Sequence, residues 1–327
     1  MSMVRDHTDW FDLGWDTQRI PTLPPIFNRK GETDMKRLAF AACCMALSTS
    51  WLFGQGPAGP RIHPPELTAK GIPVGGSPSK VFVLAGDDVV PQIANGELGG
   101  GQIFFTDFTI QNITDAPADF IVDFFRADGT PMALPQLVSQ NPDTTEDFIG
   151  LEDTIPAKGV RFSSTWPFGA DVRIGYARVT SDPPGAVVVT ALFGNLVPGS
   201  RLFQASIPMT TRNHNRLFSD YSNLFGQRSS LAVVSLTAQT ITVNARDSEG
   251  VIACSFTRPM AAGEHFPFLV QSSLPCTEAF AKGAIGEAPE GTLEVFGPDE
   301  SLAAVAFTAQ DEGLGAFTTI QVAGPTP

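Results

Sequence analysis

Basic residues and histidine are scarce in this chain of 327 residues. It has 21 Lys or Arg against 34 Asp or Glu, a formal net charge of −13, and only 4 His. From Gln55 onward the ratio is 15 to 28, so the acidic excess persists without the N-terminal part. Nucleic-acid binding needs clustered cations that neutralise phosphates. The composition therefore argues against a nucleic-acid partner and is typical of a soluble protein outside the cell.

Patterns that carry metal, phosphate or nucleophile chemistry are absent as well. His63, His214 and His265 belong to no His/Cys cluster with metal-ligand spacing. The chain has no GxSxG nucleophile elbow and no DxDxDG calcium loop. Gly99-Gly100-Gly101 lacks the following Lys-Ser/Thr of a phosphate loop. We therefore predict a protein that is not an enzyme, with no catalytic, cofactor-binding or metal-binding residues and no cofactor.

Long apolar runs are missing apart from one near the N-terminus. Met35-Lys36-Arg37 precedes a largely apolar run from Leu38 to Phe53, shorter than the about 20 residues that a membrane helix needs. A positive start and a short apolar segment are typical of a secretory signal. We expect residues 35–54 to be a signal peptide, with no stable membrane span after cleavage. The alternatives are a permanent signal anchor and a lipoprotein attached at Cys43.

The segments on either side of this signal are polar or rich in proline. Residues 1–34 precede the point where a signal should begin, so we interpret them as a spurious extension with Met35 as the true start. The alternative is a genuine cytoplasmic extension before a signal anchor. Residues 55–78 are rich in Pro and Gly, which predicts a linker. The protein is expected to be secreted or at the cell surface.

Cysteine is rare, with four residues in the whole chain. Removal of the signal leaves only Cys254 and Cys276. A single remaining pair in an exported protein predicts a disulfide, which would stabilise the fold by roughly 3 kcal/mol. Two free buried thiols are the alternative.

What the sequence does contain is an internal repeat. Residues 106–132 align without a gap with 227–253, and residues 175–193 align with 291–309 in the same order. A self-match of this kind predicts two copies of one module.

The two copies are placed at residues 79–210 and 211–327. Each is large enough to bury its own core, so we expect each to fold alone.

Short segments rich in β-branched and aromatic residues, bounded by turn residues, recur in both copies. They are 81–84, 103–111, 120–125, 160–165, 173–180, 186–193 and 202–207, then 230–236, 239–246, 251–256, 292–296, 301–309 and 316–322. Residues 266–274 are the one stretch compatible with a short helical turn. Six to seven strands per copy match the size of an immunoglobulin-like unit. The predicted fold is all-β, with two tandem immunoglobulin-like β-sandwich domains.

Several motifs carry a family resemblance. They are ANGELGGG (94–101), a strand ending near Gln111-Asn112, FFRADG (124–129), IPAKGVR (155–161) and GYARVTSDPPGAVVVTALF (175–193). With this order the chain resembles uncharacterised exported bacterial proteins built from two tandem β-sandwich modules, over about residues 79–323. The resemblance implies the architecture and no catalytic residue.

Two predicted loops are candidates for binding: residues 164–169, which contain aromatic side chains, and residues 143–153, which are acidic. Trp166 and Phe168 lie in STWPFG and form a possible interaction loop, because ring faces bind sugars and proteins; the alternative is a Trp that caps the sandwich end. Paired acids are predicted in solvated turns, with weak calcium binding possible at 143–153. Asn112-Ile113-Thr114 matches a glycan acceptor and is assigned no role.

These observations favour a structural or interaction module with an unknown protein or glycan partner. The alternative is a carbohydrate-binding or adhesive protein that uses the loops 164–169 and 143–153.

Overall fold

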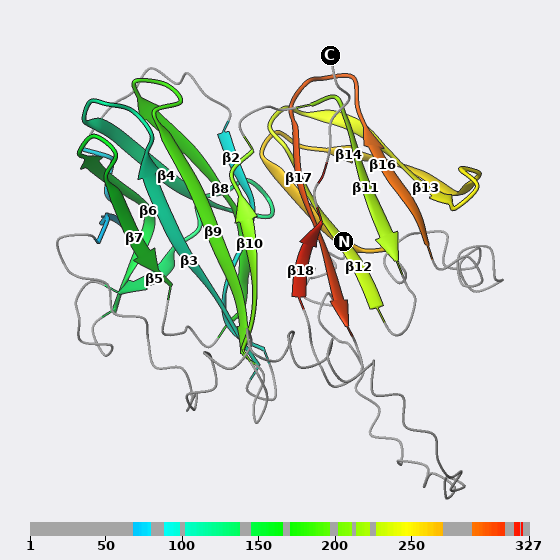
Figure 1. Ribbon diagram of the computed structural model, residues 1–327, viewed down its shortest axis with the longest axis horizontal. Helices are drawn as coiled ribbons and strands as arrows, with labels where there is room; N and C mark the ends of the chain where they lie inside the picture. The colour runs from blue at the N-terminus through cyan, green and yellow to red at the C-terminus, as the bar shows by residue number, and fades with distance from the viewer. Residues whose placement is uncertain are drawn as a thin grey trace, which may run out of the picture. The chain divides into compact units, whose positions relative to one another are not determined.

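The computed structural model describes residues 68–79, 88–98, 102–137, 145–165, 171–196, 202–210, 214–222, 227–270, 290–310, 317–320 and 322. All named elements in these ranges are β-strands, and all their pairings are antiparallel (Figure 1). The all-β prediction is therefore confirmed. A search of these ranges finds no helix with the length and hydropathy to cross a membrane. The predicted signal, residues 35–54, lies outside the described residues.

The first repeat contains ten strands, joined through β2 into one network. They are β1 (Lys70–Pro73), β2 (Asp88–Leu98), β3 (Gln102–Asn112), β4 (Ala118–Arg126), β5 (Leu134–Leu137), β6 (Thr145–Ile155), β7 (Val160–Ser164), β8 (Arg173–Asp182), β9 (Val187–Leu196) and β10 (Leu202–Pro208). The first part of β2 pairs with β8, whereas its last three residues pair with β3. β2 thereby links a β4 sheet, in the order β1-β6-β4-β8-β2, to a β3 sheet in which β3 pairs with β7 and β9, and β9 pairs with β10.

The second repeat contains eight strands in two four-stranded sheets. They are β11 (Arg216–Ser222), β12 (Gln227–Ser235), β13 (Gln239–Asp247), β14 (Ile252–Met260), β15 (Glu264–Leu269), β16 (Glu290–Phe296), β17 (Leu302–Gln310) and β18 (Phe317–Ile320). The β13 sheet has the order β11-β16-β13-β14, and the β12 sheet has the order β15-β12-β17-β18.

The strand order of the first repeat recurs in the second. The series β6-β4-β8-β2 corresponds to β14-β13-β16-β11, and β7-β3-β9-β10 corresponds to β15-β12-β17-β18. Even the register agrees with the internal alignment, because Val122 faces Val179 as Val243 faces Val295. The sequence repeat therefore corresponds to a repeat of strand pairing.

The ungapped alignment fails at one point, the turn before β9 and β17. Gln111 of β3 faces Val188 of β9, and the corresponding Ala232 of β12 faces Val305, whereas the ungapped alignment places Val188 on Ala304. The second repeat therefore has one more residue in this turn than the first.

Two glycines permit the close pairing of β4 with β8 and of β13 with β16. A Cβ on Gly175 would lie 1.8 Å from the carbonyl oxygen of Phe125, and a Cβ on Gly291 would lie 1.9 Å from that of Arg246. No side chain fits at either position. These glycines hold corresponding places in the alignment, which explains why the match is strict there.

The two sheets of the first repeat pack through apolar side chains. Phe108 of β3 and Phe124 of β4 stack with ring centroids 5.4 Å apart, and both are buried. Because neighbouring residues of a strand point to opposite faces, Phe124 faces the β3 sheet and Phe125 points outward.

The two repeats share a hydrophobic core at their junction. Val89 and Tyr176 of the β4 sheet pack with Val234 and Ala303 of the β12 sheet, and all four are fully or almost fully buried. Phe125 packs against this cluster. The described residues of both repeats accordingly belong to one compact unit. Separate folding of each repeat stays a prediction, and it would expose this junction.

Three expectations from the sequence are corrected. The segment 55–78 is not wholly a linker, because β1 pairs with β6. The acidic stretch 143–153 is not a loop from Thr145 onward, because β6 runs there between β4 and β1. Residues 266–269 belong to β15 and not to a helical turn, since Pro267 is tolerated on an edge strand. The predicted strand at 81–84 lies outside the described residues.

Candidate functional site

An open hollow of about 560 Å³ lies where β11 and β13 end and β16 begins. Its lining is polar and acidic, and consists of Asp220, Tyr221, Ser222, Asp247, Ser248, Gly250, Glu290, Gly291, Thr292 and Thr308. None of these residues was singled out for a function from the sequence. They come from segments far apart in the chain, so only the pairing of β16 with β11 and β13 brings them together.

Tyr221 and Gly291 are packed together in the lining of the hollow. The Tyr221 hydroxyl donates to the carbonyl oxygen of Arg246 over 3.0 Å, and its side chain is buried. A Cβ on Gly291 would lie 2.7 Å from the Tyr221 hydroxyl oxygen. Burial raises the pKa of Tyr221 to about 12, and the nearby Asp247 carboxylate adds to this. The phenol therefore stays protonated at neutral pH and supports the backbone.

Three carboxyl groups line the hollow, from Asp220, Asp247 and Glu290. Asp247 also closes the β13–β14 turn, because its Oδ1 accepts from the backbone N–H groups of Glu249 and Val251 over 3.0 and 2.9 Å. Within the described ranges, no group of three His, Cys, Asp or Glu side chains has metal-binding geometry. The lining of the hollow offers carboxylate oxygens as hydrogen-bond acceptors.

The outer face of the β13 sheet next to the hollow carries a polar cluster around Glu294. The Glu294 carboxylate is buried and accepts from Asn244 and Arg246, each over 3.0 Å. Burial alone would raise the pKa of Glu294, but these hydrogen bonds and the charges of Arg246 and Arg216 hold it below its usual value. Arg216 also lies over the ring of Phe296 at 5.1 Å. This face is ionic and ordered.

Glu152, one of the paired acids predicted in solvated turns, is instead buried in β6. Its carboxylate accepts from the Ser79 backbone N–H and hydroxyl, each over 2.7 Å, and from Lys70 over 3.4 Å. Burial would raise its pKa, but these bonds hold it below its usual value. Glu152 therefore attaches the segment around β1 to the sheet, and the calcium interpretation of 143–153 has no support from it.

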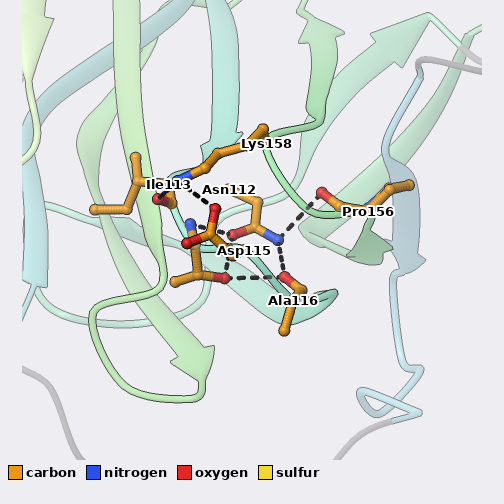
Figure 2. A network of polar contacts seen from close by, with 7 residues as sticks. Asn112, Ile113, Asp115, Ala116, Pro156 and Lys158 are labelled. Carbon is orange, nitrogen blue, oxygen red and sulfur yellow. Dashed lines mark hydrogen bonds and ion pairs between the residues drawn. The ribbon is translucent and has the colours of Figure 1, made fainter.

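The glycan-acceptor match at Asn112 has a structural explanation (Figure 2). Asn112 is fully buried, and its Nδ2 lies 2.7, 3.0 and 3.1 Å from the carbonyl oxygens of Ala116, Ile155 and Pro156. Its Oδ1 accepts from the Thr114 backbone N–H and hydroxyl, each over 2.8 Å. The Asn-Ile-Thr pattern thus arises from a turn in which both Asn112 and Thr114 hold the backbone.

The residues predicted for sites from the sequence do not gather at the hollow. Cys254 is buried in β14, whereas Cys276 lies outside the described residues, so their disulfide stays a prediction. Trp166 and Phe168 of the possible interaction loop also lie outside the described residues. His214 pairs through its backbone with Leu302.

His265 is buried at the junction between the repeats. Its ring lies 6.3 Å from that of Tyr176, and its backbone N–H donates to the carbonyl oxygen of Ala127 over 2.8 Å. Burial lowers the pKa of His265 to about 3. The imidazole is therefore neutral at physiological pH and packs as part of the junction.

A partial signal for the hollow was present in the sequence. Gly250 and Gly291 align with Gly129 and Gly175, so the shape of its backbone follows from the repeat. Its acidic residues do not recur in the first repeat, and their proximity could not be read from the alignment.

Comparison with known proteins identifies no relative of this two-repeat chain: no family model matches it, and no curated protein or solved structure matches it either.

Proposed function

We propose that this chain is an exported, non-enzymatic structural or interaction module made of two tandem immunoglobulin-like β-sandwiches, secreted or held at the cell surface. The observation that carries the proposal is the buried junction of Val89, Tyr176, Val234 and Ala303. An apolar contact of this kind holds two binding units in one orientation, because their separation would expose the cluster to water. Such rigidity suits a spacer or a scaffold.

The immunoglobulin-like assignment rests on the central strand pairs. In the second repeat the second strand, β12, pairs with the fifth, β15, and the third, β13, pairs with the sixth, β16. The corresponding pairs in the first repeat are β3 with β7 and β4 with β8. Immunoglobulin domains have the same central pairs in their two sheets. The edges differ from those of immunoglobulin domains, because in the second repeat the first strand, β11, pairs with the sixth, β16, and the seventh, β17, pairs with the second, β12. We assign a sandwich of this class with exchanged edge strands.

Export is tested by expression of the full chain from its own start region, followed by fractionation of the cells. We expect the protein in the medium or on the cell surface, with an N-terminus between about residues 48 and 58, because Lys36-Arg37 and the following apolar run form a signal. A cytoplasmic protein that keeps residues 1–34 would contradict the proposal.

A carbohydrate-binding function is the second candidate, favoured by the composition of the hollow. Carboxylates and hydroxyls line the hollow, and this combination suits the hydroxyl groups of a sugar. A glycan array should then show binding that the double substitution Asp220→Asn and Glu290→Gln removes. The matched control is Asp299→Asn with Glu300→Gln, in the turn before β17. Equal binding by all three proteins would exclude the hollow as the sugar site.

A further inference from the structure

The contact between the two repeats uses one face of each. Phe125 and Tyr176, which face each other across β4 and β8, point away from the β3 sheet and pack toward the second repeat. On the other side the contact uses Val234 and Ala303 on the outer face of the β12 sheet. By strand register Val305 lies on the same face, and it is 4% exposed. Because the repeats share their strand order, the second repeat has a counterpart of the outer β4 face, on the β13 sheet. The first repeat likewise has a counterpart of the outer β12 face, on the β3 sheet.

The first repeat has an unpartnered counterpart of the buried β12 face. By strand register, Ile113 corresponds to Val234 and Val188 corresponds to Val305. Ile113 is 47% exposed and Val188 is 36% exposed, and both are among the few large apolar side chains with such exposure in the described residues. An apolar pair thus stands on both faces, yet among the described residues only the pair on the β12 face is buried.

In the first repeat, the turn that contains Gly129 contacts the second repeat. The corresponding position in the second repeat is at the hollow. At the junction, the turn that contains Gly129 lies against Gly263, since a Cβ on Gly129 would be 3.0 Å from the carbonyl oxygen of Gly263. Gly129 aligns with Gly250, which lines the hollow. The hollow therefore lies where a turn like that of Gly263 would dock.

Lys158 takes the place of Gly263 in the first repeat. The N–H of Lys158 donates to Thr114 over 3.1 Å, as the N–H of Gly263 donates to Ser235 over 2.8 Å. Both residues have a positive φ, 56° and 76°. The Lys158 side chain is 59% exposed, and its Nζ lies 2.7 Å from the Ile113 carbonyl oxygen and 3.2 Å from Asp115 (Figure 2). An ammonium with three donors can make a further contact at this edge.

We propose that a second copy of this chain docks head to tail on the second repeat. Its outer β3 face, with Ile113 and Val188, lies against the outer face of the β13 sheet, and its Lys158 enters the hollow among Asp220, Asp247 and Glu290. The hollow is lined by three acidic residues and Lys158 brings a cation, which is shared between the hollow and Asp115 of its own copy, 3.2 Å away. The two faces differ, so the contact is heterologous and builds a ring or an open series of copies instead of a two-fold dimer.

This contact is weaker than the junction within the chain. Arg246 and Thr292 stand where the junction has Phe125 and Tyr176, so less apolar surface is buried. Association then depends on the ionic contact in the hollow and weakens as added salt screens it.

Sedimentation equilibrium of the full chain over a concentration series tests the proposal. We expect a mean mass that rises without a plateau at dimer in low salt and falls toward the monomer in high salt. Lys158→Glu and Val188→Glu should each weaken association by about tenfold or more. The matched control is Val74→Glu, which makes the same charge change as Val188→Glu at a side chain that is 61% exposed.

A charge-reversal pair sharpens the assignment. Lys158→Glu mixed with Glu290→Lys should associate more strongly than either variant alone, because the mixture again offers opposite charges at the contact. Circular dichroism confirms that each variant is folded. A monomeric wild-type protein at every concentration, a closed dimer, or an equal effect of Val74→Glu would each overturn the proposal.

Discussion

The outer faces of the β4 sheet and the β13 sheet have the same strand pairing and opposite chemistry. Phe125 faces Tyr176 on the first, and at the same register Arg246 faces Thr292 on the second. The first face packs in the apolar junction, whereas the second holds the Glu294 cluster. The two faces thus share one backbone arrangement, and their side chains decide which face is buried in an apolar contact.

Exchange of the side chains between the two faces should have the largest effect. Phe125→Arg with Tyr176→Thr copies the polar face onto the junction and removes two rings from a buried cluster. We expect a loss of about 3–5 kcal/mol in the free energy of unfolding, measured by urea denaturation. The reverse exchange, Arg246→Phe with Thr292→Tyr, is the comparison, and it should cost less because Arg216 and Asn244 still hold the Glu294 carboxylate. An unchanged stability in the first variant would show that the junction contributes little.

The predicted disulfide is a second difference between the repeats, because both of its cysteines belong to the second repeat. Cys254→Ser with Cys276→Ser should cost roughly 3 kcal/mol, because the unfolded second repeat gains conformational entropy. Thiol titration of the unfolded, unreduced protein should find neither cysteine reactive. Two titratable thiols from Cys254 and Cys276 would reject the bond.

Acid should weaken the junction through His265. Its folded pKa of about 3 lies below the value of about 6.5 in the unfolded chain, so below pH 6.5 the unfolded state binds the extra proton. The His265 contribution to stability is then full above pH 6.5 and falls by about 1.4 kcal/mol for each pH unit until about pH 3. His265→Phe should flatten this slope in urea titrations at pH 4–7. The same slope in the variant would assign the acid sensitivity to other groups.

The ionic cluster on the polar face should give the smallest change. Glu294→Gln leaves Arg246 and Arg216 without the carboxylate charge and should cost about 1.5–3 kcal/mol, a value usual for hydrogen bonds to charged groups. Because the folded pKa of Glu294 is lowered, its contribution is present at neutral pH and is lost as pH falls. Thermal melts at neutral and acid pH measure it. A variant as stable as wild type at neutral pH would show that the cluster contributes no net stability.

Much of the fold could be predicted from local patterns. The segment 120–125 and its turn correspond to β4 and Gly129, and the segment 239–246 corresponds to β13 and Gly250; both glycines have positive φ near 80°. Such turns need a glycine whatever the neighbouring strands do. β6 was missed because its residues combine acidic and apolar side chains, and its strand form depends on β4 and β1 on either side.

The candidate site was not predictable for a related reason. Asp220, Asp247 and Glu290 are each ordinary acids in turn-rich sequence, and only the pairing of β16 with both β11 and β13 brings them together. His265 likewise has no sequence signal that distinguishes it from His214, although only His265 is buried at the junction.

The sequence by itself determined the all-β class, most strand positions and the order of the repeat, because turn residues and apolar spacing act over a few residues. Only the tertiary structure decided which faces are buried. Ile113 and Val234 occupy corresponding positions, yet one is 47% exposed and the other is fully buried. The difference arises from contacts between the repeats, and local sequence carries no information on which surface another part of the chain will cover.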